Sequence, residues 1–334
     1  MLNKKRLLLL ALGTAAVGTA LIYSVYGWNF LAPSYPGGPT GTRPEALEQT
    51  VTALAGEIGP RDLYNNNKAS LRKAEAYISA RLKAAGCAVE YQEYYASGVK
   101  VKNIICSKTG SSAPGEIVVI GAHYDTYNNP GADDNASGVA GLLELAEYAK
   151  GRRYPRTVRF IAFTNEEPPF FQKDGMGSKV YADAAAQRKD DIKAALVLEM
   201  IGYYSEERFS QKYPPLIGPF LPPRGNFLAQ VSNFSSRGLA NRADKVFRGA
   251  SKLPLRTVSL PSFVYGVDNS DHRSFWAHGW PAVMFTDTSF YRTPHYHKPT
   301  DLPGTLNYEY MAAALDGLKA VMDAVAGGQD LAEK

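Results

Sequence analysis

The stretch Glu116–His123, EIVVIGAH, decides the fold. It is a short, continuous apolar run, as expected of a strand that is buried on both faces of a sheet. TVRFIAFT (157–164) and AALVLEMIG (194–202) have the same character, while SGVAGLLELAEYAKG (137–151) and GSKVYADAAAQR (177–188) predict helices between them. Strands that alternate with helices of this length predict an α/β fold with a largely parallel central sheet.

The rest of the chain continues this pattern. Helices are expected at residues 44–58, 68–86, 224–250 and 307–327, and further strands at about 88–95, 100–107 and 280–287. The predicted helices and strands alternate along the chain and do not fall into separate groups, so one domain is expected over residues 44–330. Residues 32–43 are rich in proline and glycine and are interpreted as a linker.

The N-terminus predicts export. Three basic residues at positions 4–6 are followed by no charge until Arg43. Leu7–Trp28 is about 33 Å long as a helix, enough to span a hydrocarbon core of about 30 Å. The basic flank predicts that residues 1–31 form a signal-anchor, with the body of the chain outside the cytoplasm. The alternative is a cleaved signal peptide and a secreted protein.

Two cysteines flank a predicted hairpin. If the two strands pair across a turn at Ser97 and Gly98, Cys87 and Cys106 lie within two residues of facing each other. An exported chain permits a disulfide between them. The alternative is two buried free thiols.

The overall charge excludes one class of partner. The net charge is +5 in 334 residues, and three of the positive charges lie at positions 4–6. No basic stripe is present, so nucleic-acid binding is not expected.

Side chains that could bind a metal gather where the buried strands end, and carboxyl ends of such strands face the ligand crevice of an α/β sheet. These residues are His123, Asp125, Asp133, Asp134, Glu166, Glu167 and Glu199. Each has an ordinary structural explanation when taken singly, such as a helix N-cap or a solvated turn. Together, so many carboxylates would raise one another's pKa, and a divalent metal, or better two, removes that cost.

Alternation along the strands suggests roles. His123 and Asp125 share a face, so Asp125 can accept the second N–H of a metal-bound imidazole. Glu166 and Glu167 are adjacent and diverge. One of them is therefore expected to bind metal and the other to act as a general base on water.

The motifs GAHYDT, PGADDNASGVAGLLELA, FTNEE, LEMIGYY, SDHRSFWAHGWPAVMFTDT and PHYHKPTD, in this order, resemble metallopeptidase family 28. These are di-zinc exopeptidases that include bacterial aminopeptidases, and the resemblance covers about residues 68–325. It implies a three-layer α/β/α sandwich with a mixed eight-stranded sheet, two Zn²⁺ ions as cofactors and a peptide as substrate.

The resemblance also implies individual roles. The implied metal ligands are His123 and Glu199 for one zinc, Glu167 and His297 for the other, and Asp133 as the bridge. The peptide bond between Asp133 and Asp134 would be cis. Glu166 would be the catalytic base that takes a proton from the attacking water, and Asp125 would assist as the second catalytic residue.

The chain departs from the family pattern at two points. Many relatives have Asp where this chain has Glu199, whose extra methylene would shift the ion or admit another divalent metal. The loop after Glu167 is lengthened by Pro168–Phe171, which is predicted to form an apolar wall for the substrate side chain. Among the other histidines, His295 is the alternative to His297 as a ligand, and His272 and His278 are expected to be mainly structural.

Functions of different classes remain open at this point. The first is an aminopeptidase that hydrolyses the N-terminal peptide bond. The second is another reaction of the same fold. A carboxypeptidase would need a basic cluster for the substrate carboxylate, such as Arg237, Arg242 and Arg248. A glutaminyl cyclase would have an altered DDNASG stretch, and the intact stretch in this chain argues against it. The third is a non-catalytic receptor or scaffold, disfavoured because such relatives lose ligands and none is missing here.

Overall fold

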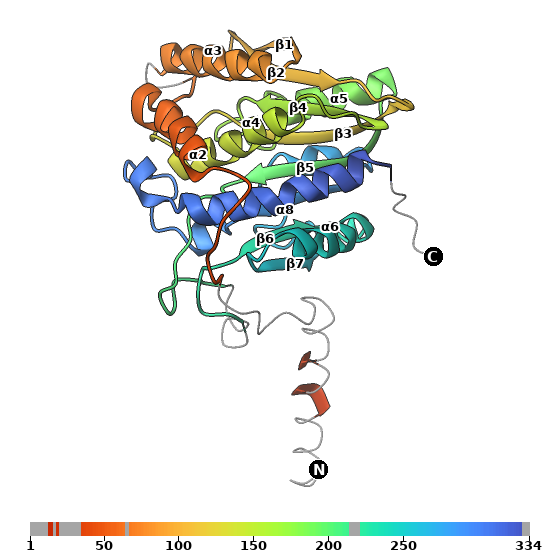
Figure 1. The fold of residues 1–334 in the computed structure, drawn as a ribbon. Helices are drawn as coiled ribbons and strands as arrows, with labels where there is room; N and C mark the ends of the chain where they lie inside the picture. Colours follow the sequence, from red (N-terminus) through yellow and green to blue (C-terminus); the bar gives the residue numbers. More distant parts are fainter. Residues whose placement is uncertain (1–12, 16–17, 20–34, 64–66, 214–220, 329–334) are drawn as a thin grey trace, which may run out of the picture.

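The computed structural model describes residues 13–15, 18–19, 35–63, 67–213 and 221–328 (Figure 1). The expected anchor or signal at 1–31 lies almost entirely outside the described residues. Within them, no helix is both long enough and apolar enough to cross a bilayer.

A mixed sheet of eight strands forms the centre, in the order β1-β2-β4-β3-β5-β8-β6-β7. The strands are β1 (Ala88–Ala96), β2 (Val99–Lys108), β3 (Ala113–His123), β4 (Arg156–Phe163), β5 (Asp191–Glu199), β6 (Leu228–Ser232), β7 (Leu255–Ser259) and β8 (Ala282–Thr286). The parallel pairs are β3/β4, β3/β5, β5/β8 and β6/β7, and the antiparallel pairs are β1/β2, β2/β4 and β6/β8. The predicted α/β class is confirmed.

Helices cover both faces of the sheet. The helices are α2 (Pro44–Val51), α3 (Lys68–Ala84), α4 (Gly138–Tyr148), α5 (Gly177–Arg188), α6 (Arg237–Ala250), α7 (His272–Trp276) and α8 (Tyr308–Ala326). Figure 1 shows α2, α3, α4, α6 and α8 on one side of the sheet, and α5 and α7 pack on the other. Val118 and Val119 on β3 belong to the two opposite cores. The strand is therefore buried on both faces, as its sequence predicts.

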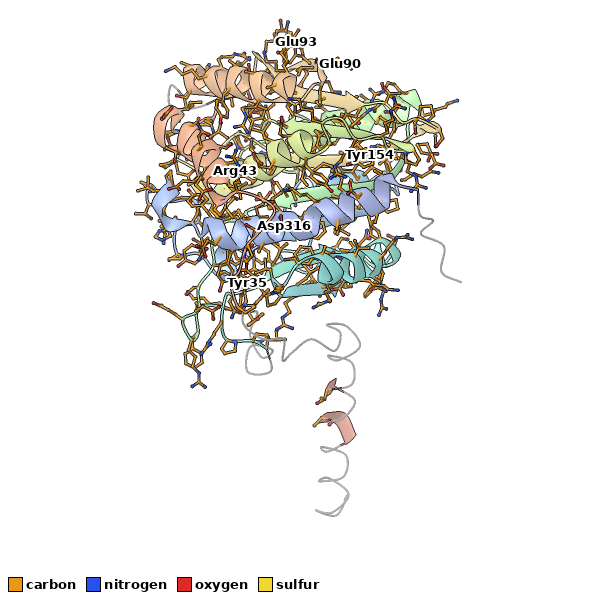
Figure 2. The ribbon with its side chains drawn as sticks, viewed as in Figure 1. Tyr35, Arg43, Glu90, Glu93, Tyr154 and Asp316 are labelled. Carbon is orange, nitrogen blue, oxygen red and sulfur yellow. A yellow bond between two sulfur atoms is a disulfide. The ribbon has the colours of Figure 1, made fainter. Side chains whose placement is uncertain are left out.

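The part of the 32–43 linker that the structure describes lies against α8. The backbone N–H groups of Gly41 and Thr42 donate to the carboxylate of Asp316, at 2.7 and 2.9 Å. The ring of Tyr35 packs edge-on against Tyr310 at 4.9 Å between centroids. Figure 2 shows Tyr35, Arg43 and Asp316 on this side of the molecule. Residues 35–43 are thus docked on the domain.

One predicted element is wrong. The expected helix at 224–250 is instead the strand Leu228–Ser232 followed by α6, and the strand Leu255–Ser259 was not predicted. All five residues of β6 are buried between β8 and β7. A short apolar run of this kind does not distinguish a buried strand from a buried helix by its periodicity.

The hairpin of β1 and β2 carries a disulfide. Ala96 pairs with Val99 across a turn in which Ser97 and Gly98 both have positive φ angles. A disulfide joins Cys87 to Cys106, with their Cα atoms 5.5 Å apart. Because Val89 pairs with Cys106, the cysteines are two residues out of register, as expected.

Candidate metal centre and substrate cavity

The parallel strands deliver the candidate ligands to one edge of the sheet. His123 is the last residue of β3 and Glu199 is the last residue of β5, which pairs with β3. Glu166 and Glu167 lie just beyond the end of β4, on the other side of β3. The carboxyl ends of parallel strands meet at one edge, which explains why residues far apart in sequence converge here.

Two groups of metal-binding side chains form and share one carboxylate. The first consists of His123, Asp134 and Glu199, and the second of Asp134, Glu167 and His297. Within each group the ligand atoms lie within 4.8 Å of one another. Asp134 faces both groups, with Oδ1 3.4 Å from Nε2 of His123 and Oδ2 3.2 Å from Nε2 of His297.

The carboxylate shared by the two groups is therefore Asp134 and not Asp133, which was expected as the bridge. Asp133 does not join either group: its Oδ1 accepts the backbone N–H of Gly202 at 2.9 Å, and its other neighbour is Asp287. The non-proline cis peptide bond is Asp134–Asn135, not Asp133–Asp134. Adjacent side chains diverge, so a shift of one residue exchanges the carboxylate that faces the centre for the one that faces away.

Two polar side chains, Asp301 and Asn135, hold the segment that carries Asp134. Asp301 accepts the backbone N–H groups of Asp133 and Asp134, at 2.9 and 3.1 Å. Asn135 donates to the carbonyl of Leu198 and accepts the N–H of Met200, which ties it to the end of β5 beside Glu199. Asp301 is the last residue of the PHYHKPTD motif. This motif therefore supplies His297 and also holds the backbone that carries Asp134.

Arg61 holds the backbone on both sides of the candidate metal centre, and the sequence patterns did not indicate this role. Its guanidinium is fully buried and donates to the carbonyls of Leu54, Gly59, Tyr124, Pro130 and Gly131. It thereby fixes the residue after His123 and the start of the segment that carries Asp134. No motif signalled this role, because the partners of Arg61 are backbone carbonyls distant in sequence.

Asp125 links His123 to the two glutamates. One of its carboxylate oxygens lies 3.5 Å from Nδ1 of His123, which also lies 3.2 Å from the backbone carbonyl of Asp125. The two oxygens accept the backbone N–H groups of Glu166 and Glu167, each at 3.1 Å. Glu167 then contacts His297 at 3.1 Å and belongs to a ligand group, whereas Glu166 belongs to neither group, and both glutamates line the adjoining cavity. The metal-binding and base roles expected of the two glutamates stay predictions.

The electrostatics of the centre favour a bound cation. Burial, followed by the charges of Glu199 and Glu167, raises the pKa of Glu166 well above its usual range, although His123 opposes the rise. Burial and the nearby Asp134 raise the pKa of Glu167 to about 8. Burial alone would lower the pKa of His297, but Asp134 and Glu167 raise it to about 10. A divalent cation neutralises this excess of buried negative charge.

The remaining histidines make ordinary contacts. His295 lies 2.9 Å from the hydroxyl of Thr300 and outside both ligand groups, so the geometry favours His297. His272 is buried and donates to the carbonyl of Val267, and His278 lies 2.8 Å from Asp183.

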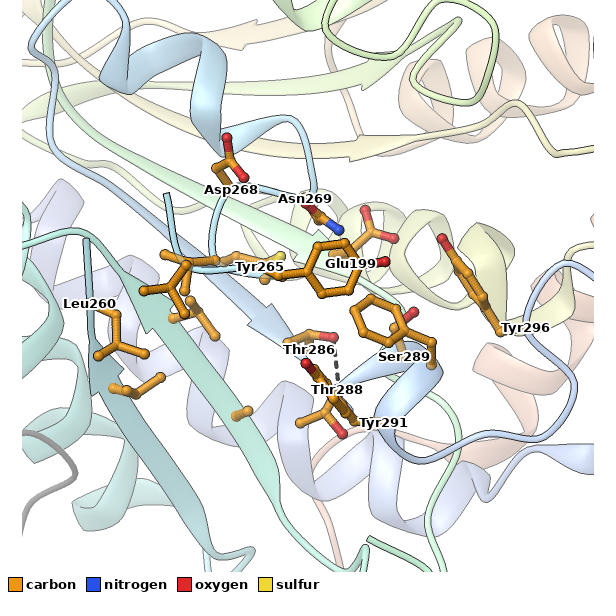
Figure 3. A pocket seen from close by; sticks show the side chains of 18 of the residues that line it. Glu199, Leu260, Tyr265, Asp268, Asn269, Thr286, Thr288, Ser289, Tyr291 and Tyr296 are labelled. Carbon is orange, nitrogen blue, oxygen red and sulfur yellow. Dashed lines mark hydrogen bonds between the residues drawn. The ribbon is translucent and has the colours of Figure 1, made fainter. Parts of the chain in front are cut away.

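A cavity of about 840 Å³ opens on the centre. Glu166, Glu167 and Glu199 lie at one end, and its walls come from β6, β7, β8 and the segment 260–269. Figure 3 shows Glu199 with Tyr296, Tyr265 and Leu260 around this cavity. From the lengthened loop, Pro168 and Phe171 line the cavity, whereas Phe170 is buried against Gly175.

The donor set fits zinc. Zinc takes histidine nitrogen and carboxylate oxygen, and both groups present these atoms from buried or half-buried side chains. Nε2 of His297 and Oε1 of Glu167 are buried without a hydrogen bond of good geometry, which leaves them free to coordinate an ion. The fold and the centre together define a metal-dependent hydrolase of the α/β/α class.

The comparisons identify the family. The model of peptidase family M28 matches residues 103–322, and the chain belongs to this family. The uncharacterized protein YfbL of Escherichia coli (strain K12) is 39% identical over 85% of this chain and 88% of its own length. The probable aminopeptidase YDR415C of Saccharomyces cerevisiae is 27% identical over 64% of this chain, which spans 54% of that protein.

Solved structures show the same fold. LapB from Legionella pneumophila has a TM-score of 0.68 at 20% identity and covers 92% of this chain and 81% of its own. BSAP, a zinc aminopeptidase from Bacillus subtilis, has a TM-score of 0.64 at 16% identity and covers 85% and 95%. A glutaminyl cyclase from Fimbriiglobus ruber has a TM-score of 0.63 at 21% identity and covers 88% and 99%.

Proposed function

We propose that this protein is a zinc aminopeptidase that removes the N-terminal residue of peptides. The observation that carries the proposal is the pair of ligand groups sharing Asp134, with Glu166 beside them in one cavity. His123, Asp134 and Glu199 would hold one Zn²⁺, and Asp134, Glu167 and His297 a second.

Bound zinc would polarise the scissile carbonyl and lower the pKa of water. Glu166 is the general base: its backbone is held by Asp125, its side chain lines the cavity, and it belongs to neither ligand group. It takes a proton from the attacking water and returns it to the leaving amine. Asp125 positions both His123 and Glu166 and does not itself touch the substrate.

The test uses the purified full-length chain and aminoacyl-p-nitroanilides. Activity is measured as purified, after chelation and after zinc is returned, with zinc content determined by mass spectrometry. We expect two zinc ions per chain, loss of activity on chelation and recovery with zinc. Two bound zinc ions without activity would exclude the aminopeptidase, and absence of zinc binding would exclude the ligand assignment.

A glutaminyl cyclase is the second candidate, because one of the structural neighbours has that activity. Release of ammonia from a peptide with N-terminal glutamine, without hydrolysis of leucine p-nitroanilide, would favour it. The carboxypeptidase has less support, since a carboxylate anchor is needed within one residue of the scissile bond. Arg237, Arg242 and Arg248 lie on α6, and none of them lines the cavity.

We also keep the proposal that residues 1–31 direct export, as an anchor or a cleaved signal, with the catalytic domain at 44–330 outside the cytoplasm. The disulfide between Cys87 and Cys106 supports it, because such bonds persist in oxidising compartments. Mass spectrometry of the mature protein's N-terminus in cell fractions decides between the two forms. An intact chain in the cytosol would exclude both.

A further inference from the structure

The cavity has a second polar end, opposite the metal centre. Glu199 on β5 pairs with Thr286 on β8, Thr286 with Ala229 on β6, and Ala229 with Arg256 on β7. All four line the cavity, so they form one row across its floor. Three strand spacings of about 4.8 Å place the backbone of Arg256 about 14 Å from that of Glu199.

Arg256 forms no ion pair with a carboxylate among the residues that the structure describes. Its Nε and Nη1 atoms are buried without a hydrogen bond. The ring of Phe227 lies 5.8 Å from the guanidinium carbon in a cation–π contact, and Tyr213 is also close to its charge. Burial and the charge of Arg248 lower the pKa of Arg256 to about 10, so it stays cationic at neutral pH.

A half-buried guanidinium without a carboxylate partner costs free energy, and its presence in a substrate cavity indicates an anionic ligand. A planar guanidinium suits a carboxylate, which it can bind through two parallel hydrogen bonds. The wall between Arg256 and the metal centre is apolar, with Val231 and Met284 in one small hydrophobic cluster and Val258 packed against it. The cavity thus combines a metal end, an apolar middle and a cationic end.

We infer that Arg256 binds the C-terminal carboxylate of a short peptide whose N-terminal bond lies at the metal centre. The inference rests on the proposed aminopeptidase function and narrows its substrates to apolar peptides of about five residues. Counted from the scissile bond, the carboxylate of an extended pentapeptide lies four residues of about 3.4 Å away, which matches the distance of about 14 Å. A glutamate side chain next to the scissile bond is too short for its carboxylate to reach Arg256. In a carboxypeptidase substrate the terminal carboxylate lies one residue from the scissile bond, and it is therefore also too far from Arg256.

The test compares pentaleucine with pentaleucine amide, which differ only in the terminal carboxylate. We expect wild-type kcat/KM to be about 10- to 100-fold higher for the acid, as for a charge-assisted hydrogen bond. In Arg256→Met this preference disappears, because kcat/KM for the acid falls to that for the amide. Lys212→Met is the matched control, since Lys212 is the other cation in the cavity lining, and it should retain the preference.

Binding gives a readout that does not require turnover. Calorimetry with pentaleucine carrying a reduced first peptide bond should show the same 10- to 100-fold difference in affinity between acid and amide in wild type, and this difference should be lost in Arg256→Met. Equal affinities in wild type overturn the inference even if Arg256→Met does not fold. Loss of preference in Lys212→Met instead, or an effect of Arg256→Met confined to glutamyl p-nitroanilide, also overturns it. Failure to hydrolyse leucine p-nitroanilide with zinc bound counts against the proposed function alone.

Discussion

At the scale of single residues, the centre depends on which of two adjacent aspartates faces the ligands. Asp134 contacts both His123 and His297, while Asp133 accepts the N–H of Gly202 and lies beside Asp287. Burial and the carboxylates of Asp287 and Asp301 raise the pKa of Asp133 well above its usual range. The two residues therefore have separate roles despite identical chemistry.

Replacement of each aspartate by asparagine distinguishes these roles. Asp134→Asn removes the shared carboxylate, so we expect both zinc ions to bind at least about tenfold more weakly and activity to fall by more than 100-fold. Asp133→Asn should keep two zinc ions, because its side chain lies outside both groups. Zinc titration followed by mass spectrometry measures this. The opposite pattern would restore Asp133 as the bridge.

Glu166 is predicted to act in proton transfer and not in metal binding. Glu166→Gln keeps the shape of the side chain but cannot accept a proton, so kcat should fall by about 10²- to 10⁴-fold. Zinc content should remain as in wild type, since Glu166 is absent from both ligand groups. A variant that loses zinc together with activity would show that Glu166 is a ligand.

At the scale of elements, the hairpin of β1 and β2 forms one border of the sheet, and its disulfide closes a short loop. The sequence separation of 19 residues corresponds to a stabilisation of about 3 kcal/mol in the chain-entropy treatment. Cys87→Ser combined with Cys106→Ser should lower the free energy of unfolding by about that amount in urea titrations. Two titratable thiols in the denatured, unreduced wild type would contradict the bond.

The β6 and β7 strands decide the shape of the substrate cavity. They lie beyond β8 and continue the sheet away from the metal centre, so that Ala229 and Arg256 extend the row that begins at Glu199. Without these two strands the cavity would end near Thr286. The sequence predicted a helix where β6 lies and no strand at β7, so Arg256 was not recognised as a residue of the cavity.

At the scale of the whole molecule, burial of His272 makes folding sensitive to acid. Burial lowers its pKa to about 4, whereas the unfolded chain binds a proton near pH 6.5. Between these values the unfolded state holds more protons, so the contribution of His272 is complete above pH 6.5 and is lost as pH falls toward 4. The loss is at most about 3 kcal/mol.

His272→Gln tests this contribution. The amide can still donate to the carbonyl of Val267 but does not titrate. The difference in unfolding free energy between wild type and variant, measured by urea titration from pH 7.5 to 4, should change steadily below pH 6.5. A difference that is constant with pH would show that His272 does not titrate on unfolding.

The sequence by itself determined the α/β class, the strands of the central sheet that end in ligands, the position of the disulfide and most of the residues of the metal centre. These features depend on local patterns: continuous apolar runs, helix-length intervals, and polar residues placed at strand ends. His123, Glu167 and Glu199 were found in this way, because parallel strands bring their carboxyl ends to one edge, whereas His297 was identified only through the resemblance of the PHYHKPTD motif to the family.

Three features could be seen only in the folded chain. They are the orientation of Asp134 and not Asp133 toward both ligand groups, the positions of Arg61 and Arg256, and the place of β6 in the sheet. Each of these depends on contacts between distant segments. Asp301 and Asn135 set which aspartate faces the ligands, carbonyls from separate loops converge on Arg61, and pairing across β8, β6 and β7 carries Arg256 into the cavity. Periodicity along a chain describes which face a residue takes within its own element, and it contains no information about what lies across that face.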